Sequence, residues 1–336
     1  MSLETENSSK MISLVTPIYN EENNIDEFIS QIDLVLSQSG YEYEIICVND
    51  GSTDSSAEHI KKRADSSPKV KFIDLSRNFG KEVALSAGLD FATGDAVVIM
   101  DADLQHPPQL ILTFLQKWRE GYDGVFGVRV KRSEESTTKR LLTGIFYKIL
   151  QKVSEVHIPP NAGDFRLLDR SVVDALVQLP ERTRFMKGLY AWVGFRQIGV
   201  EYEAHERVAG ETKWSMLNLW SLALEGLFSF SSAPLKVWSY LGFIIALMSL
   251  VYAFIVTIDA ILSGSSLPGI PSILTAVFFI GGVQLMTAGI LGEYISRVFV
   301  EVKRRPVYIV RNHNGFDMQI LLAMKKRRDQ ANLRSE

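Results

Sequence analysis

The stretch VVIMDADLQHPP, Val97 to Pro108, decides the fold class and indicates the chemistry of the chain. Four apolar residues lead directly into Asp101, Ala102 and Asp103. Two acids separated by one residue point the same way from an extended chain, so they repel each other unless a cation lies between them. Mg²⁺ and Mn²⁺ take hard oxygen ligands and commonly need one or two carboxylates plus substrate phosphates. The stretch therefore favours a buried strand ending at a divalent-metal site; the alternative is a solvated strand end with two surface acids.

Short apolar segments alternate with helical segments around this stretch, over residues 11–130. We predict strands at 11–19, 43–50, 69–76, 95–101 and 123–130, and helices at 22–40, 53–65 and 80–94. Such alternation predicts an α/β fold with a mostly parallel sheet, helices on both faces, and ligands bound at the carboxyl ends of the strands. Asp50 and Asp101 obey that rule, because each ends a predicted strand.

The overall composition excludes several classes of protein. The chain has 336 residues and a net charge of −3, so no basic field predicts binding to nucleic acid. Its single cysteine, Cys47, lies in an apolar run and is interpreted as a buried core thiol, and the five histidines show no ligand spacing. Without a disulfide framework or a zinc pattern, a reducing cytoplasmic setting is expected.

Two long uncharged runs lie at 237–258 and 271–292. Each matches the roughly 20 residues that a helix needs to cross a bilayer, so we predict two transmembrane helices, at about 234–258 and 271–296. A pair of buried core helices is the alternative. Basic residues precede the first run and follow the second, whereas the connecting loop has no Lys or Arg. Because positive flanks stay cytoplasmic, we expect a multi-pass protein of the plasma (inner) membrane with the α/β domain and both termini in the cytoplasm.

Composition also sets the predicted boundaries along the chain. Residues 1–10 are polar and expected to be disordered, 11–214 form the α/β domain, and 233–297 hold the two membrane helices. Residues 215–232 are apolar but broken by polar side chains, which favours an amphipathic interfacial helix over a helix packed on the globular domain. Residues 298–336 are predicted to be a basic cytoplasmic tail, within which PVYIVRNHNGF is an extended segment or a short strand pair.

Five stretches in this order carry a family resemblance: TPIYNEENNI, VNDGSTD, LSRNFGKEVALSAGLDFATGDAVVIMDADLQHPP, GDFRLLDR and RVAGETKW. Together they resemble the polyisoprenyl-phosphate glycosyltransferases, a branch of the inverting family-two glycosyltransferases. That branch includes the dolichyl-phosphate mannose synthases and the bactoprenol glucosyltransferases. The resemblance covers residues 11–300. It implies a Rossmann-like GT-A catalytic domain, a nucleotide-sugar donor, Mg²⁺ or Mn²⁺, and a polyprenyl phosphate acceptor in the membrane.

The resemblance also implies a donor side at the strand ends. The residues implied to bind the donor are Pro17, Tyr19, Glu21, Asp50, Lys81, Asp101 and Ala102, and those implied to hold the metal are Asp101, Asp103 and Gln105. Asp50 resembles the acid that accepts from the uracil ring; the alternative is a cap for the following helix. Lys81 either approaches the diphosphate or is solvated, since the chain has no P-loop pattern. His106 has no counterpart in the family pattern and is interpreted as a loop residue.

The acceptor side needs cations, because a phosphate monoester is mostly dianionic at neutral pH and a strong general base is less necessary. Residues resembling the lipid-phosphate ligands of the family are Arg129, Arg140 and Arg207, with Lys213 as a further cation. Asp164 lies in the usual region of the catalytic base, so Asp103 and Asp164 are the catalytic candidates. The alternative for Asp164 is a structural acid paired with Arg166.

These observations lead to one hypothesis with two rivals. We expect an inverting glycosyltransferase that moves a hexose, with UDP-glucose as the expected donor, onto undecaprenyl phosphate or a similar polyprenyl phosphate at the cytoplasmic membrane face. Homo-oligomer formation is left open. One rival is a processive polysaccharide synthase, although the chain has no Q-x-x-R-W motif. The other is a non-catalytic, membrane-tethered nucleotide-sugar sensor or scaffold.

Overall fold

The computed structural model describes residues 10–129, 162–203 apart from 180 and 183, separate positions between 240 and 262, and 269–317. The strands are β1 (Met11–Ile18), β2 (Glu42–Asn49), β3 (Val70–Leu75), β4 (Ala96–Ile99), β5 (Gly124–Arg129), β6 (Ala162–Asp169), β7 (Gln197–Tyr202) and β8 (Val310–Asn314). The helices are α1 (Ile25–Ser37), α2 (Ser56–Ser66), α3 (Lys81–Phe91), α4 (Leu110–Arg119), α6 (Arg170–Gln178), α7 (Met186–Trp192) and α10 (Ile270–Val302). The predicted helices and strands of residues 11–130 are confirmed, with small shifts of their ends.

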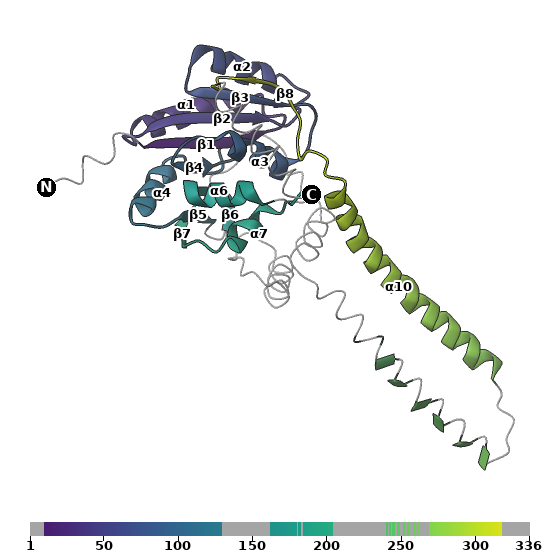
Figure 1. Cartoon of the computed structure of the whole chain (residues 1–336). Helices are drawn as coiled ribbons and strands as arrows, with labels where there is room; N and C mark the ends of the chain where they lie inside the picture. Colours follow the sequence, from purple (N-terminus) through teal and green to yellow (C-terminus); the bar gives the residue numbers. More distant parts are fainter. Residues whose placement is uncertain are drawn as a thin grey trace.

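The described strands form one eight-stranded sheet in the order β7-β5-β6-β4-β1-β2-β3-β8 (Figure 1). The neighbours β4, β1, β2 and β3 are parallel to one another, and β5 is parallel to β7. Strand β6 runs antiparallel between β4 and β5, and β8 runs antiparallel to β3. The predicted α/β fold with a mostly parallel sheet is therefore confirmed, with β6 and β8 as the two reversed strands.

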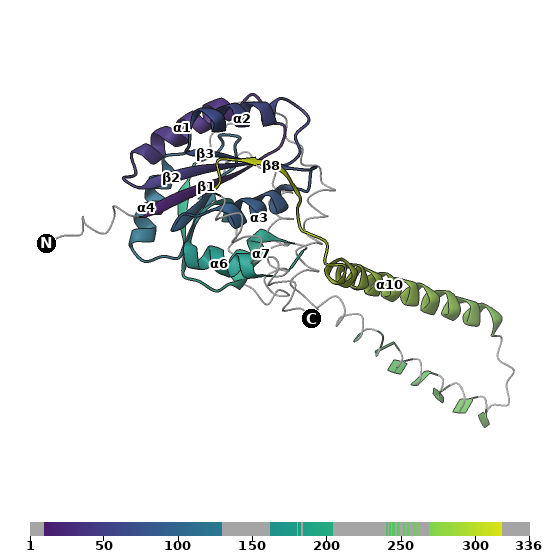
Figure 2. The same cartoon turned by 45° about the horizontal axis from the view of Figure 1, so that its top comes forward.

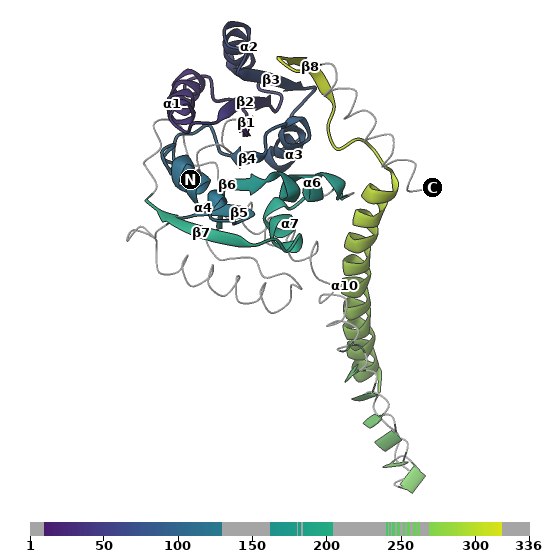
Figure 3. The ribbon, with the colours of Figure 1, turned by 60° about the vertical axis from the view of Figure 1, so that its left-hand side comes forward.

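Helices cover both faces of the sheet, as the alternation of segments predicts. Helices α1, α2 and α4 pack their apolar side chains into one core, and α3, α6 and α7 pack theirs into the other (Figure 3). Strand β2 shows why residues 45–48 are apolar without a break: Ile45 and Cys47 belong to the first core, whereas Ile46 and Val48 belong to the second. Burial raises the pKa of the Cys47 thiol to about 12, which agrees with an inert core residue.

Strand β8 returns to the sheet after the long helix α10 (Figure 2). Side chains also tie this segment to two helices: the Tyr308 hydroxyl donates to Asp90 of α3 at 2.7 Å, and the Asn314 side-chain amide donates to Asp65 of α2 at 2.6 Å. The segment predicted as part of a basic tail therefore completes the sheet. Its middle residues, Arg311, Asn312 and His313, are polar and exposed, so its apolar pattern is too weak to distinguish a strand from an extended segment.

Helix α10 projects away from the sheet and covers the second predicted membrane span, residues 271–296 (Figures 1 and 3). Many of its apolar side chains are exposed, among them Leu285, Ile295 and Val302. Among the residues that the structure describes, no helix meets the combined requirement of length and apolar character for crossing a membrane. The predicted interfacial helix at 215–232 lies outside the described residues, and the first predicted span is described only at separate positions from residue 240 onward.

Candidate active site

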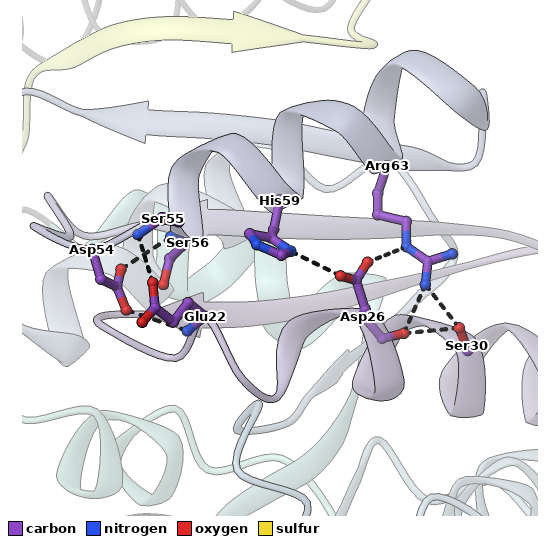
Figure 4. Close-up of polar contacts among 8 residues, drawn as sticks. All are labelled: Glu22, Asp26, Ser30, Asp54, Ser55, Ser56, His59 and Arg63. Atoms are coloured by element: carbon purple, nitrogen blue, oxygen red, sulfur yellow. Dashed lines mark hydrogen bonds and ion pairs between the residues drawn. The ribbon is translucent and has the colours of Figure 1, made fainter.

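The loops that follow β1 and β2 are joined at the carboxyl edge of the sheet. The backbone amide of Glu21 donates to Ser56 Oγ at 2.9 Å. The backbone amide of Ser55 donates to the Glu22 carboxylate, also at 2.9 Å (Figure 4). Pro17 lies in β1 just before this loop, and the ring of Tyr19 is 42% exposed within it. The predicted nucleoside-binding turn is therefore held to the segment after β2 by hydrogen bonds, and Tyr19 is exposed on it.

The two helices that leave these loops are fastened by one carboxylate. Asp26 of α1 accepts from Arg63 Nε at 2.6 Å and contacts His59 Nδ1 at 2.8 Å, and both partners lie on α2 (Figure 4). Arg63 also donates to Ser30 Oγ at 3.1 Å. Hydrogen bonds from Arg63 and His59 hold the pKa of the Asp26 carboxyl below its usual value. These exposed ion pairs contribute little stability, but they join α1 to α2 beside the loops of the site.

Asp50, at the end of β2, is buried and binds the next loop of the site. Its two carboxylate oxygens accept from the amides of Phe79 at 2.7 Å and Gly80 at 2.9 Å. Burial raises the pKa of Asp50, and the two amide bonds partly oppose that rise. The cap position of α2 is occupied by Ser55, so the interpretation of Asp50 as a helix cap is wrong. Asp50 instead fixes the residue that precedes Lys81, and its contact with a base stays a prediction.

The D-x-D segment follows β4 as a compact turn. Asp103 Oδ1 accepts from the backbone N–H of Gln105 at 3.1 Å. Leu104 has a positive φ of 56°, and Ala102 is buried. The described residues include no cluster of three or more His, Cys, Asp or Glu side chains that could hold a metal. Two carboxylates and the amide oxygen of Gln105 are nevertheless a hard-oxygen set that fits Mg²⁺ or Mn²⁺ when substrate phosphates complete the shell.

Lys81, the first residue of α3, bridges two predicted site acids. Its Nζ lies 2.7 Å from Asp101 Oδ2 and 2.8 Å from Asp164 Oδ2. A third residue, Lys187 of α7, places its Nζ 3.7 Å from Asp164 Oδ1. Burial alone would lower the pKa of Lys81, but the charges of Asp101 and Asp164 outweigh it and raise that pKa. An ammonium group is therefore held between Asp101 and Asp164, whereas the cation predicted between Asp101 and Asp103 stays a prediction.

Asp164 projects from β6 and is ionised by its two lysine neighbours. Its burial would raise its pKa, but Lys81 and Lys187 together hold the pKa of this carboxyl far below its usual range. Such a carboxylate is a weak proton acceptor. The ion pairs of Asp164 are thus with lysines, whereas Arg166 donates to the Gly163 carbonyl at 2.8 Å and stacks 3.7 Å from the Tyr190 ring centre. The role of Asp164 as base or structural acid stays a prediction.

Glu82 follows Lys81 in α3, and its pKa is raised into the physiological pH range. Its burial, with the nearby negative charge of Asp164, raises its pKa from 4.5 to about 7. Between pH 4.5 and about 7, the folded protein therefore retains a proton on Glu82 that the unfolded chain has lost. The contribution of Glu82 to the free energy of unfolding is therefore fully present below pH 4.5, and it is lost as the pH rises through about 7.

We expect Glu82→Gln to flatten this pH dependence, because glutamine imitates the protonated acid at every pH. The unfolding midpoint of the wild-type protein should fall by about 5 °C more than that of the variant between pH 5 and pH 8. Thermal unfolding of both proteins at the two pH values measures this difference. The exposed Glu58→Gln is the matched control and should follow the wild type. Equal pH slopes for the wild type and Glu82→Gln would contradict the assignment.

His106 contacts two aromatic residues that lie far from it along the chain. Its Nδ1 lies 2.7 Å from the Tyr202 hydroxyl, and its ring stacks on Phe165 with centres 5.1 Å apart. Burial lowers the pKa of His106, so a neutral ring is favoured. The interpretation as a loop residue is thus incomplete: His106 fixes the D-x-D turn against β6 and β7. The partners are far apart along the chain, so no local pattern could have indicated them.

Only one of the predicted acceptor-side cations falls within the described residues. Arg129 ends β5, is exposed, and lies opposite Tyr202 of β7 in the parallel register. Burial raises the pKa of Tyr202 to about 12, and the Arg129 charge opposes that rise. Arg140, Arg207 and Lys213 lie outside the described residues. The site therefore presents a guanidinium at the β5–β7 end, next to the tyrosine that contacts His106.

Known proteins match this chain over most of its length. The family model described as glycosyl transferase family 2 matches residues 13–177. An uncharacterized glycosyltransferase of Synechocystis is 50% identical, over 91% of this chain and 96% of that protein. The bactoprenol glucosyl transferase derived from the SfII prophage of Shigella flexneri is 46% identical, over 90% and 99%. A prophage bactoprenol glucosyl transferase homolog of Escherichia coli is 44% identical, over 89% and 98%. The resemblance found in the sequence is thus confirmed: the chain is a glycosyltransferase and belongs to glycosyl transferase family 2, in the group that contains the bactoprenol glucosyl transferases.

Proposed function

We propose that this glycosyltransferase moves glucose from UDP-glucose onto undecaprenyl phosphate, with inversion at the anomeric carbon. One observation carries the proposal: the D-x-D turn and its basic neighbours occur in a chain that matches proteins named bactoprenol glucosyl transferase over almost their whole length. Bactoprenol is the lipid carrier named in those relatives, and UDP is the nucleotide that the Asp50 interpretation favours.

The chain's own residues support a single displacement. An acceptor phosphate oxygen forms a bond to the anomeric carbon while the bond from that carbon to the donor β-phosphate oxygen breaks, so the configuration inverts. Asp101, Asp103 and Gln105 would hold a Mg²⁺ or Mn²⁺ ion, which when bound neutralises charge on the departing diphosphate. Lys81 supplies a second positive charge at the same edge. Since the acceptor is already anionic at neutral pH, Asp164 need not take a proton.

We also propose that the reaction occurs at the cytoplasmic face of the membrane. The uncharged runs at 237–258 and 271–292, and the exposed apolar side chains of α10, support a two-helix transmembrane hairpin. Basic residues flank the hairpin only on the side of the catalytic domain. Nucleotide sugars are made in the cytoplasm, so the donor would need no transport.

Cysteine labelling tests this arrangement in a Cys47→Ser background. A probe introduced by Ser265→Cys should react with an impermeant reagent in intact cells. Probes introduced by Ser9→Cys or Asn332→Cys should react only after permeabilisation. Labelling in the opposite pattern would separate the active site from the donor and reject the membrane proposal.

The reaction itself is tested with radiolabelled UDP-glucose and membranes containing the protein. The proposal expects label in a lipid fraction that releases glucose on mild acid treatment. Label in a long polymer would favour a processive synthase, and binding of the nucleotide sugar without any product would favour a sensor. Membranes from cells without the protein provide the background, and UDP-galactose and GDP-mannose test the choice of donor.

Arg129→Ala should impair use of the lipid phosphate and spare the donor. Loss of a charge-assisted hydrogen bond of this kind corresponds to about a 10- to 100-fold higher KM for the acceptor. The affinity for UDP-glucose, measured by calorimetry, should stay within a few-fold of the wild type. Lys62→Ala, which removes one positive charge from the exposed face of α2, is the control. A loss of donor affinity with unchanged acceptor saturation would move Arg129 to the nucleotide side.

A further inference from the structure

The Lys81 ammonium group lies between the carboxylates of Asp101 and Asp164 and forms an ion pair with each. We propose that Lys81 is an exchangeable positioning residue: it holds Asp101 and Asp164 together before the donor binds, and it gives up Asp101 to the divalent cation that arrives with the nucleotide sugar. This inference rests on the metal-dependent transfer proposed above. It gives a role in metal loading to a side chain that the sequence assigns only to donor binding.

The sheet itself creates the need for a cation at this point. Strands β4 and β6 are antiparallel neighbours in which Ile99 pairs with Arg166. Continuing that register past the end of β4 places Asp101 opposite Asp164. Like charges directly opposite each other on neighbouring strands repel. The Lys81 ammonium contacts both carboxylates, at 2.7 Å and 2.8 Å, and so removes the repulsion.

The backbone of Lys81 is fixed, whereas its side chain is long and partly exposed, so it can exchange partners. The residue before it, Gly80, donates its amide to Asp50 at 2.9 Å, and Lys81 begins α3. The Lys81 side chain is 40% exposed and has four rotatable bonds along a flexible stem. A dication attracts the Asp101 carboxylate more strongly than a single ammonium does. Once Asp101 turns to the metal, Lys81 remains on Asp164 and directs its other N–H donors toward the diphosphate.

Lys187 supplies a matched comparison for this exchange. It is a second lysine beside the same Asp164, at 3.7 Å from Oδ1, but it projects from α7 and its ion pair is with Asp164. Removing either lysine takes one positive charge from the cluster. Only the removal of Lys81 also releases the Asp101 oxygen that the metal would use. The change at Lys187 therefore measures what the loss of one positive charge beside Asp164 adds to cation binding, and exchange predicts a clearly larger gain for the change at Lys81.

The test measures Mn²⁺ binding to the full-length, metal-free protein in detergent by electron paramagnetic resonance, without nucleotide. Lys81→Met should bind Mn²⁺ about tenfold more tightly than the wild type, because a charged hydrogen bond no longer competes for Asp101. Lys187→Met should stay within about twofold. Lys81→Gln provides the same comparison if the methionine variant has a lowered unfolding temperature.

The second arm adds UDP and distinguishes this inference from the function on which it rests. The wild type should bind Mn²⁺ with UDP present, and Lys81→Met should bind UDP about tenfold more weakly because the diphosphate loses its lysine. Equal gains in Mn²⁺ affinity for the two lysine variants, or no gain for Lys81→Met, would overturn the exchange and leave the proposed function intact. A wild type that binds no Mn²⁺ even with UDP would overturn both.

Discussion

Replacing Asp103 with asparagine is expected to reduce sugar transfer by about 10³-fold, to the limit of detection of the radiolabel assay. The change removes one of two carboxylate charges from the predicted metal site and leaves the departing diphosphate poorly neutralised. The turn itself should survive, because the asparagine side-chain oxygen can still accept from the backbone N–H of Gln105, as Asp103 Oδ1 does at 3.1 Å. The expected loss is therefore chemical rather than structural.

Two controls accompany this prediction. Glu58→Gln removes a carboxylate charge from the exposed face of α2 and should leave transfer unchanged. The wild-type protein in excess chelator should be as inactive as Asp103→Asn and should recover on addition of Mn²⁺ or Mg²⁺. Full turnover in excess chelator would reject the metal site, and a lowered unfolding temperature for Asp103→Asn would assign the loss to misfolding.

Gly51→Ala should be among the most destabilising single-methyl changes in the catalytic domain. Gly51 has φ +67°, and an added Cβ would lie 2.4 Å from the Arg77 carbonyl carbon and 2.5 Å from the Asn78 nitrogen. A left-handed backbone costs a residue with a Cβ about 1–2 kcal/mol, and a backbone clash adds about 1–3 kcal/mol. We expect a total loss of about 3 kcal/mol, because neither backbone can move without disturbing the Asp50 contacts.

Gly40→Ala isolates the two contributions. Gly40 has φ +75°, but an added Cβ there would meet nothing within 4 Å. Its substitution should therefore show only the conformational cost, about 1 kcal/mol. In thermal unfolding, the Gly51 variant should lose roughly 6–12 °C and the Gly40 variant roughly 2–4 °C. Equal shifts would mean that the loop of residues 77–79 adjusts freely to the added methyl group.

The sequence predicts the part of the fold, residues 11–130, in which the local apolar pattern agrees with the burial of the strands. The apolar runs of β1, β2 and β3 are strands that are buried on both faces, so composition alone reveals them. The D-x-D acids follow from their position at a strand end. The order of the antiparallel strands does not follow, because β6 inserts between β4 and β5 across a long intervening segment. Pairing at that range depends on the whole sheet rather than on neighbouring residues.

The site illustrates the same limit. Lys81 and Asp164 are 83 residues apart, and the bridge between them exists only because β6 lies beside β4. Their individual assignments in the sequence, to the donor and to proton transfer, therefore could not reveal that the two charges neutralise each other. The contact of His106 with Tyr202 spans 96 residues and is equally invisible to a local pattern. Residue types indicate the chemistry of the site, and topology determines which of them act together.

The late position of β8 has a consequence for how the protein is made. Translation proceeds from the N-terminus, so β3 and the rest of the sheet leave the ribosome well before β8, which follows α10 in the chain. Until then the outer edge of β3, including Phe72 and Ile73, presents unpaired backbone groups that can pair with another chain. Synthesis of the whole hydrophobic segment thus precedes closure of the sheet. The nascent domain carries an open edge throughout that interval, when a chaperone would most usefully bind it.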